Sequence, residues 1–117
     1  MEERIRPLVI RFKDGDTYEL DFNRESVSFA ENRGFDPDEV TKFPTTKIPE
    51  FFYYAFRMNH KKLAKNQTDA ILTKLGGLTP KMTERLILLY NQAIMSNQVF
   101  QDDEDLEKNA EATVEMD

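Results

Sequence analysis

Five aromatic side chains fall within six consecutive positions near the middle of the chain, and this cluster constrains the fold more than any other feature. They are Phe51, Phe52, Tyr53, Tyr54 and Phe56. If residues 48–63 form a helix, all of them except Tyr53 share an apolar arc of roughly 200° with Ile48, Ala55 and Met58. Such an arc must be covered from more than one side, so we predict a central helix between a small sheet and later helices.

Two short segments near the N-terminus alternate between apolar and polar residues, which is typical of half-buried strands. Their inward positions are Leu8, Ile10, Phe12, Tyr18, Leu20 and Phe22. The sequence Asp-Gly-Asp at 14–16 separates them and favours a tight turn. An isolated hairpin is only marginally stable in water, so we expect this one to pack on the central helix.

Capping residues and Gly or Pro stops divide the rest of the chain into helical segments. The predicted helices span 24–33, a turn or two after residue 36, 48–63, a segment ending at 75, and 80–97. Their predicted caps are Asn23, Asp36, Thr46 and Asn66, and the predicted stops include Gly34 and the pair Gly76 and Gly77. The last helix has an apolar stripe of Met82, Leu86, Leu89, Tyr90, Ala93 and Ile94. The predicted fold class is therefore α+β, an N-terminal β-hairpin packed on four or five helices.

Charge divides the chain into two parts. Residues 101–117 hold eight acidic side chains and one lysine, whereas residues 1–100 hold 14 acidic and 15 basic ones. We expect one folded domain over 1–100, with a loose charged start at 1–6, and an acidic, disordered tail over 101–117. The chain has no cysteine and no early apolar run, so a disulfide framework, a secretory signal and a membrane span are not expected.

No catalytic, cofactor or metal motif stands out. His60 is the only histidine, and no cysteine and no close carboxylate accompany it, so we interpret it as a surface residue at a helix end. Gly76 and Gly77 lack the spacing of a phosphate-binding loop. We therefore expect no enzymatic activity, no cofactor and no metal site.

Two candidate interaction sites remain. The basic segment 57–65 contains Arg57, His60, Lys61, Lys62 and Lys65, but the near-neutral body and the acidic tail disfavour nucleic-acid binding. Tyr53 and Arg57 lie off the apolar arc, with Lys61 one turn further along. Exposed Tyr and Arg often anchor protein interfaces, so Tyr53, Arg57 and Lys61 are the candidate protein-binding residues.

The order of these segments resembles a known family of small proteins. The resemblance rests on 18–24 (YELDFNR), 26–35 (SVSFAENRGF), 43–61 (FPTTKIPEFFYYAFRMNHK), 75–80 (LGGLTP) and the helix around 84–91. It covers about residues 8–95. The family is encoded in the tail-gene block of phages and prophages of Gram-positive bacteria, and it is similar in size and layout to the tail assembly chaperones of long-tailed phages.

The resemblance implies a non-enzymatic role in the host cell cytoplasm. Such a chaperone coats the long apolar tape-measure protein before the tail tube polymerises around it. In many systems a ribosomal frameshift produces a longer form that recruits the tail tube protein. The acidic tail could keep coated particles apart or connect to that extension. Two alternatives stay open, namely a structural tail or head–tail completion protein and a small nucleic-acid-binding regulator.

Overall fold

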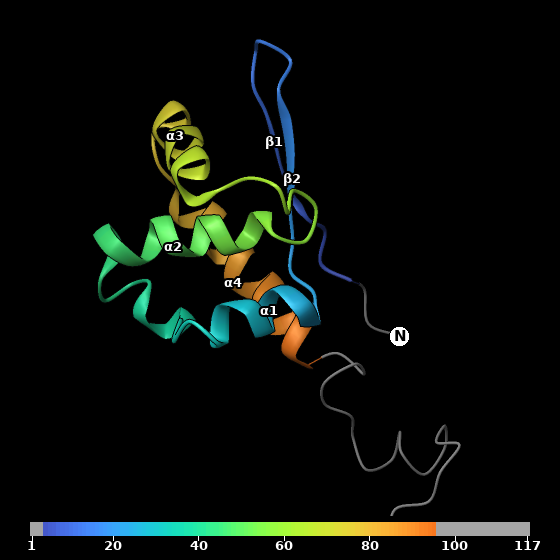
Figure 1. The fold of residues 1–117 in the computed structure, drawn as a ribbon, viewed down its shortest axis with the longest axis vertical. Coiled ribbons are helices and arrows are strands. Elements are labelled where there is room, and N and C mark those ends of the chain that lie inside the picture. The colour runs from blue at the N-terminus through green and yellow to red at the C-terminus, as the bar shows by residue number, and fades with distance from the viewer. Residues whose placement is uncertain (1–3, 96–117) are drawn as a thin grey trace, which may run out of the picture.

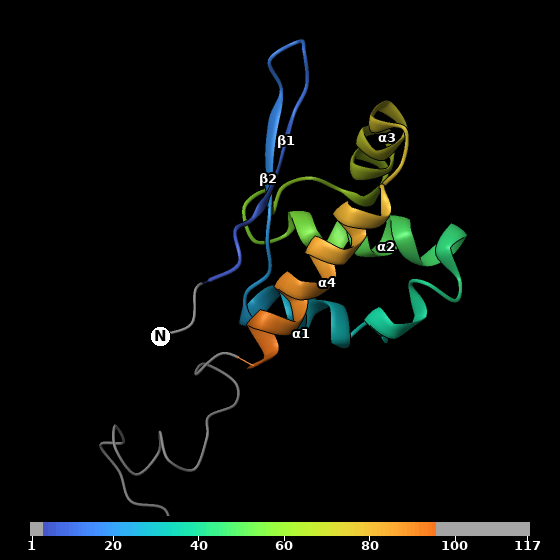
Figure 2. The ribbon, with the colours of Figure 1, turned by 180° about the vertical axis from the view of Figure 1, so that it is seen from behind.

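A computed structural model describes residues 4–95 of the chain. Its elements are two strands, β1 (Leu8–Arg11) and β2 (Thr17–Leu20), a 3-10 turn η1 (Pro37–Glu39), and four α-helices, α1 (Arg24–Glu31), α2 (Pro44–Phe56), α3 (Lys65–Leu75) and α4 (Pro80–Met95). Figure 1 shows the hairpin standing beside the helices, and Figure 2 shows α4 crossing the back of α2. The predicted α+β fold is confirmed. The expectation of a disordered tail over 101–117 lies outside the described residues.

The hairpin follows the predicted alternation. β1 and β2 are antiparallel, with Leu8 opposite Leu20 and Ile10 opposite Tyr18. Ile10 and Leu20 are buried, whereas Val9 points outward and is 40% exposed. Because successive side chains of a strand face opposite sides, one face of the hairpin packs on the helices and the other faces solvent.

The tip of the hairpin is fastened to α3. The Lys74 Nζ lies 2.5 Å from Asp14 Oδ2 and 3.6 Å from Asp16 Oδ2. The same ammonium group lies 4.3 Å from the centroid of the Phe12 ring. The Lys74 side chain lowers the pKa of the Asp14 carboxyl, mainly through their hydrogen bond. This contact holds the turn against the helical body.

Helix α2 is the central element, as predicted from its aromatic cluster. It contacts α1, α3, β2 and η1. Phe51 is fully buried and stacks on Phe22 and Phe35, with ring centroids 5.4 and 5.3 Å apart. The Tyr90 ring of α4 meets Phe51 edge-on at 6.0 Å. Elements distant in sequence thus share one aromatic core.

The bounds of α2 differ from the predicted 48–63. The helix begins at Pro44, whose fixed φ suits the first helical position, so Thr46 lies inside the helix and does not cap it. It ends at Phe56, after which the Arg57 amide donates to the Tyr54 carbonyl three residues back at 3.2 Å and the His60 amide donates to the Phe56 carbonyl at 2.7 Å. The Glu19 amide of β2 then donates to His60 Nε2 at 3.1 Å. The basic residues expected on the helix lie in a loop fastened to the hairpin.

The other helix termini agree with the prediction in part. Asn23 caps α1, since its Oδ1 accepts from the Ser26 amide at 2.8 Å. The helix ends at Glu31, two residues earlier than expected. Asn66 does not cap α3, which begins at Lys65, where the Gln67 side chain accepts from the Ala64 amide. Gly76 ends α3 in the left-handed conformation with φ +86°, as predicted.

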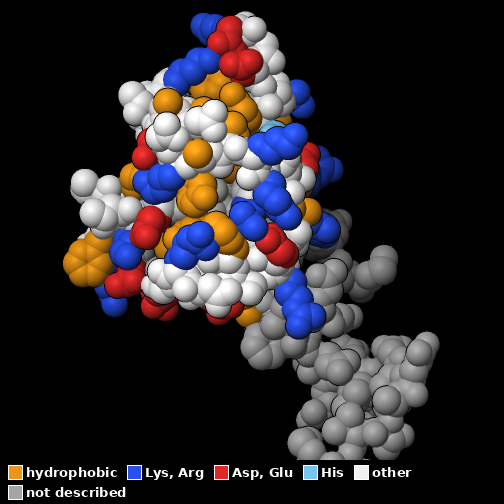
Figure 3. Space-filling view, in the orientation of Figure 1, with side chains coloured by type: hydrophobic (Ala, Val, Ile, Leu, Met, Phe, Trp, Pro, Cys, Tyr) orange, Lys and Arg blue, Asp and Glu red, His pale blue; other side chains and the backbone are white. Residues whose placement is uncertain are grey.

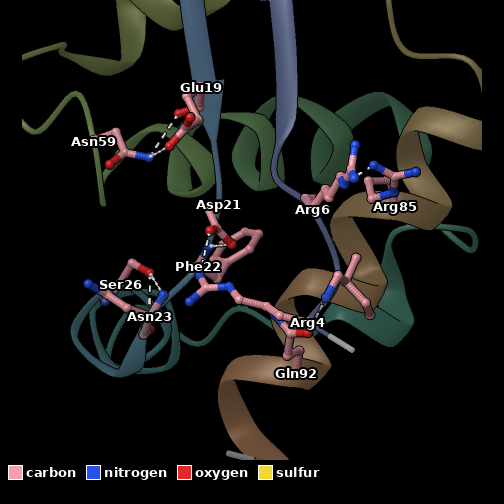
Figure 4. A network of polar contacts seen from close by, with 11 residues as sticks. Arg4, Arg6, Glu19, Asp21, Phe22, Asn23, Ser26, Asn59, Arg85 and Gln92 are labelled. Atoms are coloured by element: carbon pink, nitrogen blue, oxygen red, sulfur yellow. Dashed lines mark hydrogen bonds and ion pairs between the residues drawn. The ribbon is translucent and has the colours of Figure 1, made fainter. Parts of the chain in front are cut away.

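The N-terminal residues 4–6 are held against the core, contrary to the expectation that residues 1–6 are loose. Figure 4 shows Arg4 reaching the buried Asp21, at 2.9 Å between Nη2 and Oδ2. The Ile5 amide donates to Gln92 Oε1 at 2.7 Å. Arg85 Nη1 donates to the Arg6 carbonyl at 3.3 Å. These long-range contacts, which the local sequence does not reveal, tie the start of the chain to Asp21 and to α4.

Candidate binding surfaces

Tyr53 and Arg57, two of the predicted protein-binding residues, lie at the end of α2 and contact side chains of α1. Arg57 donates from Nε and Nη2 to Glu25 Oε1 at 3.0 and 2.9 Å. Its guanidinium carbon lies 3.7 Å from the centroid of the Phe29 ring, and that of Arg33 lies at the same distance. The Phe29 ring is therefore held between two guanidinium groups. Tyr53 contacts this ring edge-on at 6.2 Å.

Lys61, the third predicted residue, belongs to the edge of the same cluster. Its Nζ lies 3.9 Å from Glu25 Oε1, and its side chain is 60% exposed, against 25% for Arg57. The structure thus brings the three predicted residues together around α1. Arg57 is already paired with Glu25, and this pair attaches α1 to the end of α2. Binding of a partner by this cluster stays a prediction.

The other residues of the basic segment are engaged within the molecule to different degrees. Lys65 pairs with Asp69 at 3.1 Å. The His60 ring packs edge-on against Tyr18, at 5.5 Å between ring centroids. Lys62 is exposed. Figure 3 shows basic side chains over this end of α2 with acidic and hydrophobic ones among them.

The ionisable side chains in the described part of the chain form ion pairs at several separate places on the surface. Residues 4–95 contain no group of three or more His, Cys, Asp or Glu side chains placed to hold a metal ion. The most perturbed side chain is Tyr90, which lies in the aromatic core. Burial raises its pKa to about 12, with smaller contributions from Glu31 and Asp36. Its hydroxyl has no hydrogen-bond partner in the structure of residues 4–95.

An apolar groove opens between the start of α2 and the first half of α4. It has a volume of about 410 Å³. Its lining consists of Val40, Thr41, Pro44, Ile48, Leu78, Pro80, Thr83, Glu84, Ile87 and Leu88, among which Glu84 is the only charged residue. We call this surface the α2–α4 groove.

Two large hydrophobic side chains are exposed, one in the lining of the α2–α4 groove and one next to a lining residue in the sequence. Leu88 lines the groove and is 42% exposed, and Phe43, which precedes the lining residue Pro44, is 56% exposed. Lys81 and Arg85 lie beside it, since they line an adjoining hollow together with Glu84 and Leu88. The groove therefore offers an apolar floor with cations at one side.

The chain matches one protein-family model over nearly its whole length. Residues 3–116 match a family model described as Domain of unknown function (DUF5055). The chain belongs to this family. The DUF5055 match includes both the folded residues 4–95 and most of the acidic segment that follows. No curated protein and no solved structure matches the chain.

Sequence reasoning missed the α2–α4 groove of this DUF5055 chain. The predicted stripe of α4 accounts for Leu86, Leu89, Tyr90 and Ala93, which are buried. It leaves Ile87 and Leu88 without a role. The signal was present in residues 86–90, where five apolar residues follow one another, because one buried helix face does not need a continuous apolar run.

Proposed function

We propose that this protein is a phage tail assembly chaperone, which binds the tape-measure protein and keeps it soluble in the host cell cytoplasm while the tail tube assembles. The order of segments that resembles such chaperones suggests the role. The observation that carries the proposal is the α2–α4 groove with Leu88 exposed in its lining.

The shape and chemistry of the groove suit a helical apolar ligand. Amphipathic helices bind to proteins by laying a stripe of apolar side chains, spaced three and four residues apart, into such a groove. The volume of about 410 Å³ lies within the range of about 300–1,000 Å³ found for ligand sites. A groove of this kind recognises apolar side chains on any helix, which suits a very long tape-measure protein with many similar segments.

The groove supports binding and not chemistry. Glu84 is its only ionisable lining residue, so no acid–base pair or nucleophile is available there. The two tyrosines whose pKa is raised, Tyr54 and Tyr90, are buried in the core. The Asp14–Lys74 pair lies at the hairpin tip. This distribution favours a non-enzymatic role.

The test is co-expression with the tape-measure protein, with its soluble fraction as the measurement. The informative variant is Leu88→Lys, which places a charge at the groove and gains a favourable spacing from Glu84 one turn earlier. The matched control is Val9→Lys on the outer face of the hairpin, where Val9 is 40% exposed and faces Glu19 on the next strand. Both variants should fold, because both sites are on the surface.

We expect the unmodified chain and Val9→Lys to keep the tape-measure protein soluble and Leu88→Lys to lose most of this effect. Loss of one partly buried leucine contact of about 1.5 kcal/mol corresponds to about tenfold weaker binding. Equal solubility with all three chains, or without any of them, would remove the chaperone proposal. Presence of the protein at fixed copy number in purified virions would instead favour the completion-protein alternative.

The tail tube protein is the second proposed partner. It would bind a frameshifted longer form, whose extra domain would follow this chain. Co-purification of tube protein with the longer form but not with the 117-residue chain is the expected result. Co-purification with neither form would exclude this second interaction and leave the first proposal in place.

A further inference from the structure

We propose that the α2–α4 groove has a resting occupant within the same chain, namely Val99 and Phe100 together with the acidic residues 102–105 that follow them. The tape-measure helix would have to displace this segment. The competition with the tape-measure helix rests on the proposed function, whereas the contact between the segment and the groove does not. Four features of the described residues and the sequence support it.

First, the groove and the point where the segment begins lie along one face of α4. Leu88 and Met95 are seven residues apart, so they lie on the same face of the helix. Met95 is 70% exposed and is the last described residue of α4. The chain therefore continues from the end of the surface on which the groove opens.

Second, the length of chain is sufficient. Leu88 lies seven residues before Met95, a rise of roughly 10 Å along the helix. Five extended residues, 96–100, span up to about 17 Å. Ser96 and Asn97 are residue types that favour a reversal of direction. Phe100 can thus return to Leu88, and the acidic residues after it can reach the first turns of α4.

Third, the charges are complementary. Residues 4–95 hold 15 basic and 12 acidic side chains, whereas residues 101–117 hold one basic and eight acidic ones. Lys81 and Arg85 lie beside the groove, and Lys81 has no ion pair within residues 4–95. Glu84 opposes the interaction, but Lys81 lies one turn before it on α4 and Arg85 is the residue after it. An acidic segment running back along α4 would meet these cations after its aromatic residue enters the groove.

Fourth, the order of residue types in the segment matches the chemistry of the groove. Val99 and Phe100 form the only adjacent pair of large apolar residues after Met95, and four consecutive acids follow one residue later. An apolar floor with cations at one side fits an apolar pair followed by acids. A second copy of the chain could offer the same segment, so the experiment must separate a contact within one chain from a contact between chains.

The test uses a nitroxide attached to a single introduced cysteine in the full chain. Because the chain has no cysteine, Gln101→Cys provides one unique site and leaves the charges unchanged. The measured quantity is the paramagnetic loss of the methyl NMR signals of Ile48 and Leu78, which line the groove. The matched control carries the same label with Val99→Ser and Phe100→Ser, so it keeps the tether and the acids but lacks the apolar pair.

We expect strong loss of the Ile48 and Leu78 signals in the labelled chain and little loss in the control. Raising NaCl from 0.1 M to 1 M shortens the screening length from about 10 Å to about 3 Å, so the signals should recover in part. Equal signal loss in the labelled chain and the control would overturn the proposal. So would equally strong signal loss in isotope-labelled chains without the nitroxide when they are mixed with nitroxide-labelled chains without the isotope.

A second measurement tests whether the segment competes with a helical ligand for the groove. A fluorescent amphipathic helical peptide with leucines spaced three and four residues apart should bind the Val99→Ser, Phe100→Ser variant several-fold more tightly than the unmodified chain. Unchanged affinity would show that the segment does not compete with the peptide for the groove. If the nitroxide contact is found but the tape-measure protein is insoluble in co-expression, the proposed function fails while the contact stands.

Discussion

Tyr90 shows how burial and hydrogen bonding of a single side chain can act in opposite directions. Its ring contacts Phe22, Phe35 and Phe51 in the aromatic core and is 1% exposed. Its hydroxyl has no partner in the structure of residues 4–95. A buried polar group without a partner loses its hydration and gains no hydrogen bond, so the ring stabilises the fold and the hydroxyl opposes it.

We therefore expect Tyr90→Phe to leave the free energy of unfolding unchanged or to raise it by about 1 kcal/mol. Urea unfolding followed by circular dichroism provides the measurement. Tyr90→Ala is the control, because it removes the ring contacts and should cost about 3–5 kcal/mol. A loss of more than about 1 kcal/mol in Tyr90→Phe would indicate that the hydroxyl has a hydrogen-bond partner.

The raised pKa of Tyr90 predicts a second difference between the same two proteins. Below about pH 10 the hydroxyl is protonated in both the folded and the unfolded state and contributes no pH dependence. Between pH 10 and about 12 the unfolded state ionises while the folded state keeps its proton, so stability falls as pH rises. The free energy of unfolding of Tyr90→Phe, relative to that of the unmodified protein, should therefore rise by about 1.4 kcal/mol per pH unit in this window. A constant difference between pH 9 and pH 11 would contradict the assignment.

At the scale of elements, short polar contacts fasten the outer segments to the core. Asp14 and Lys74 join the hairpin tip to α3, and Arg57 joins the end of α2 to α1. Exposed ion pairs contribute little to stability by themselves, whereas a guanidinium that also stacks on a ring contributes more. The attachment of α1 should therefore depend on Arg57 and hardly on Lys61.

Arg57→Ala is expected to lower the free energy of unfolding by about 1–2 kcal/mol, because it removes both the pair with Glu25 and the contact with the Phe29 ring. Lys61→Ala should change it by less than about 0.5 kcal/mol, since Lys61 is more exposed and more distant from Glu25. Urea unfolding of both variants measures the difference. Equal effects would show that charge alone, and not ring stacking, holds α1.

At the scale of the whole molecule, the aromatic contacts form two groups, and α2 contributes rings to both. Tyr18 of β2 lies 5.5 Å from Phe56 of α2, whereas rings from α1, from α4 and from the segments between elements lie within about 6 Å of Phe51 or Tyr54 of α2. Both groups belong to one hydrophobic core among the described residues. A single packed core of this size favours all-or-none unfolding.

We expect one cooperative unfolding transition. Circular dichroism at far-ultraviolet wavelengths reports the helices, and tyrosine fluorescence reports the core and the hairpin, because the chain has four tyrosines and no tryptophan. The two urea curves should coincide. A tyrosine transition at lower urea than the helical one would show that the hairpin separates before the helices unfold.

The predictions that succeeded depend on local periodicity. The alternation of the hairpin, the aromatic arc of α2, the Asn23 cap and the Gly76 stop all arise from residues close together in sequence. Two of the failed predictions depend on distant contacts, whereas the misplaced caps at Thr46 and Asn66 have local causes. Residues 57–63 do not continue α2, because His60 and Asn59 bind to Glu19 of the hairpin. Residues 4–6 are not loose, because they contact Asp21 and Gln92.

The candidate site divides in the same way. The sequence identified Tyr53, Arg57 and Lys61 as neighbours on one side of a helix, but their contact with α1 required the packing of two helices. The α2–α4 groove joins Val40, Ile48 and Leu88, which are far apart in the chain. No local pattern specifies such a surface.

The amino-acid sequence by itself determined which segments form strands and helices and which face of each is apolar, because the period of a strand or helix and its caps are local properties of the backbone. Only the tertiary structure decided where α2 ends, what holds the N-terminal residues and where an apolar groove stays open. Those features depend on how side chains distant in sequence fill or fail to fill the space between packed elements.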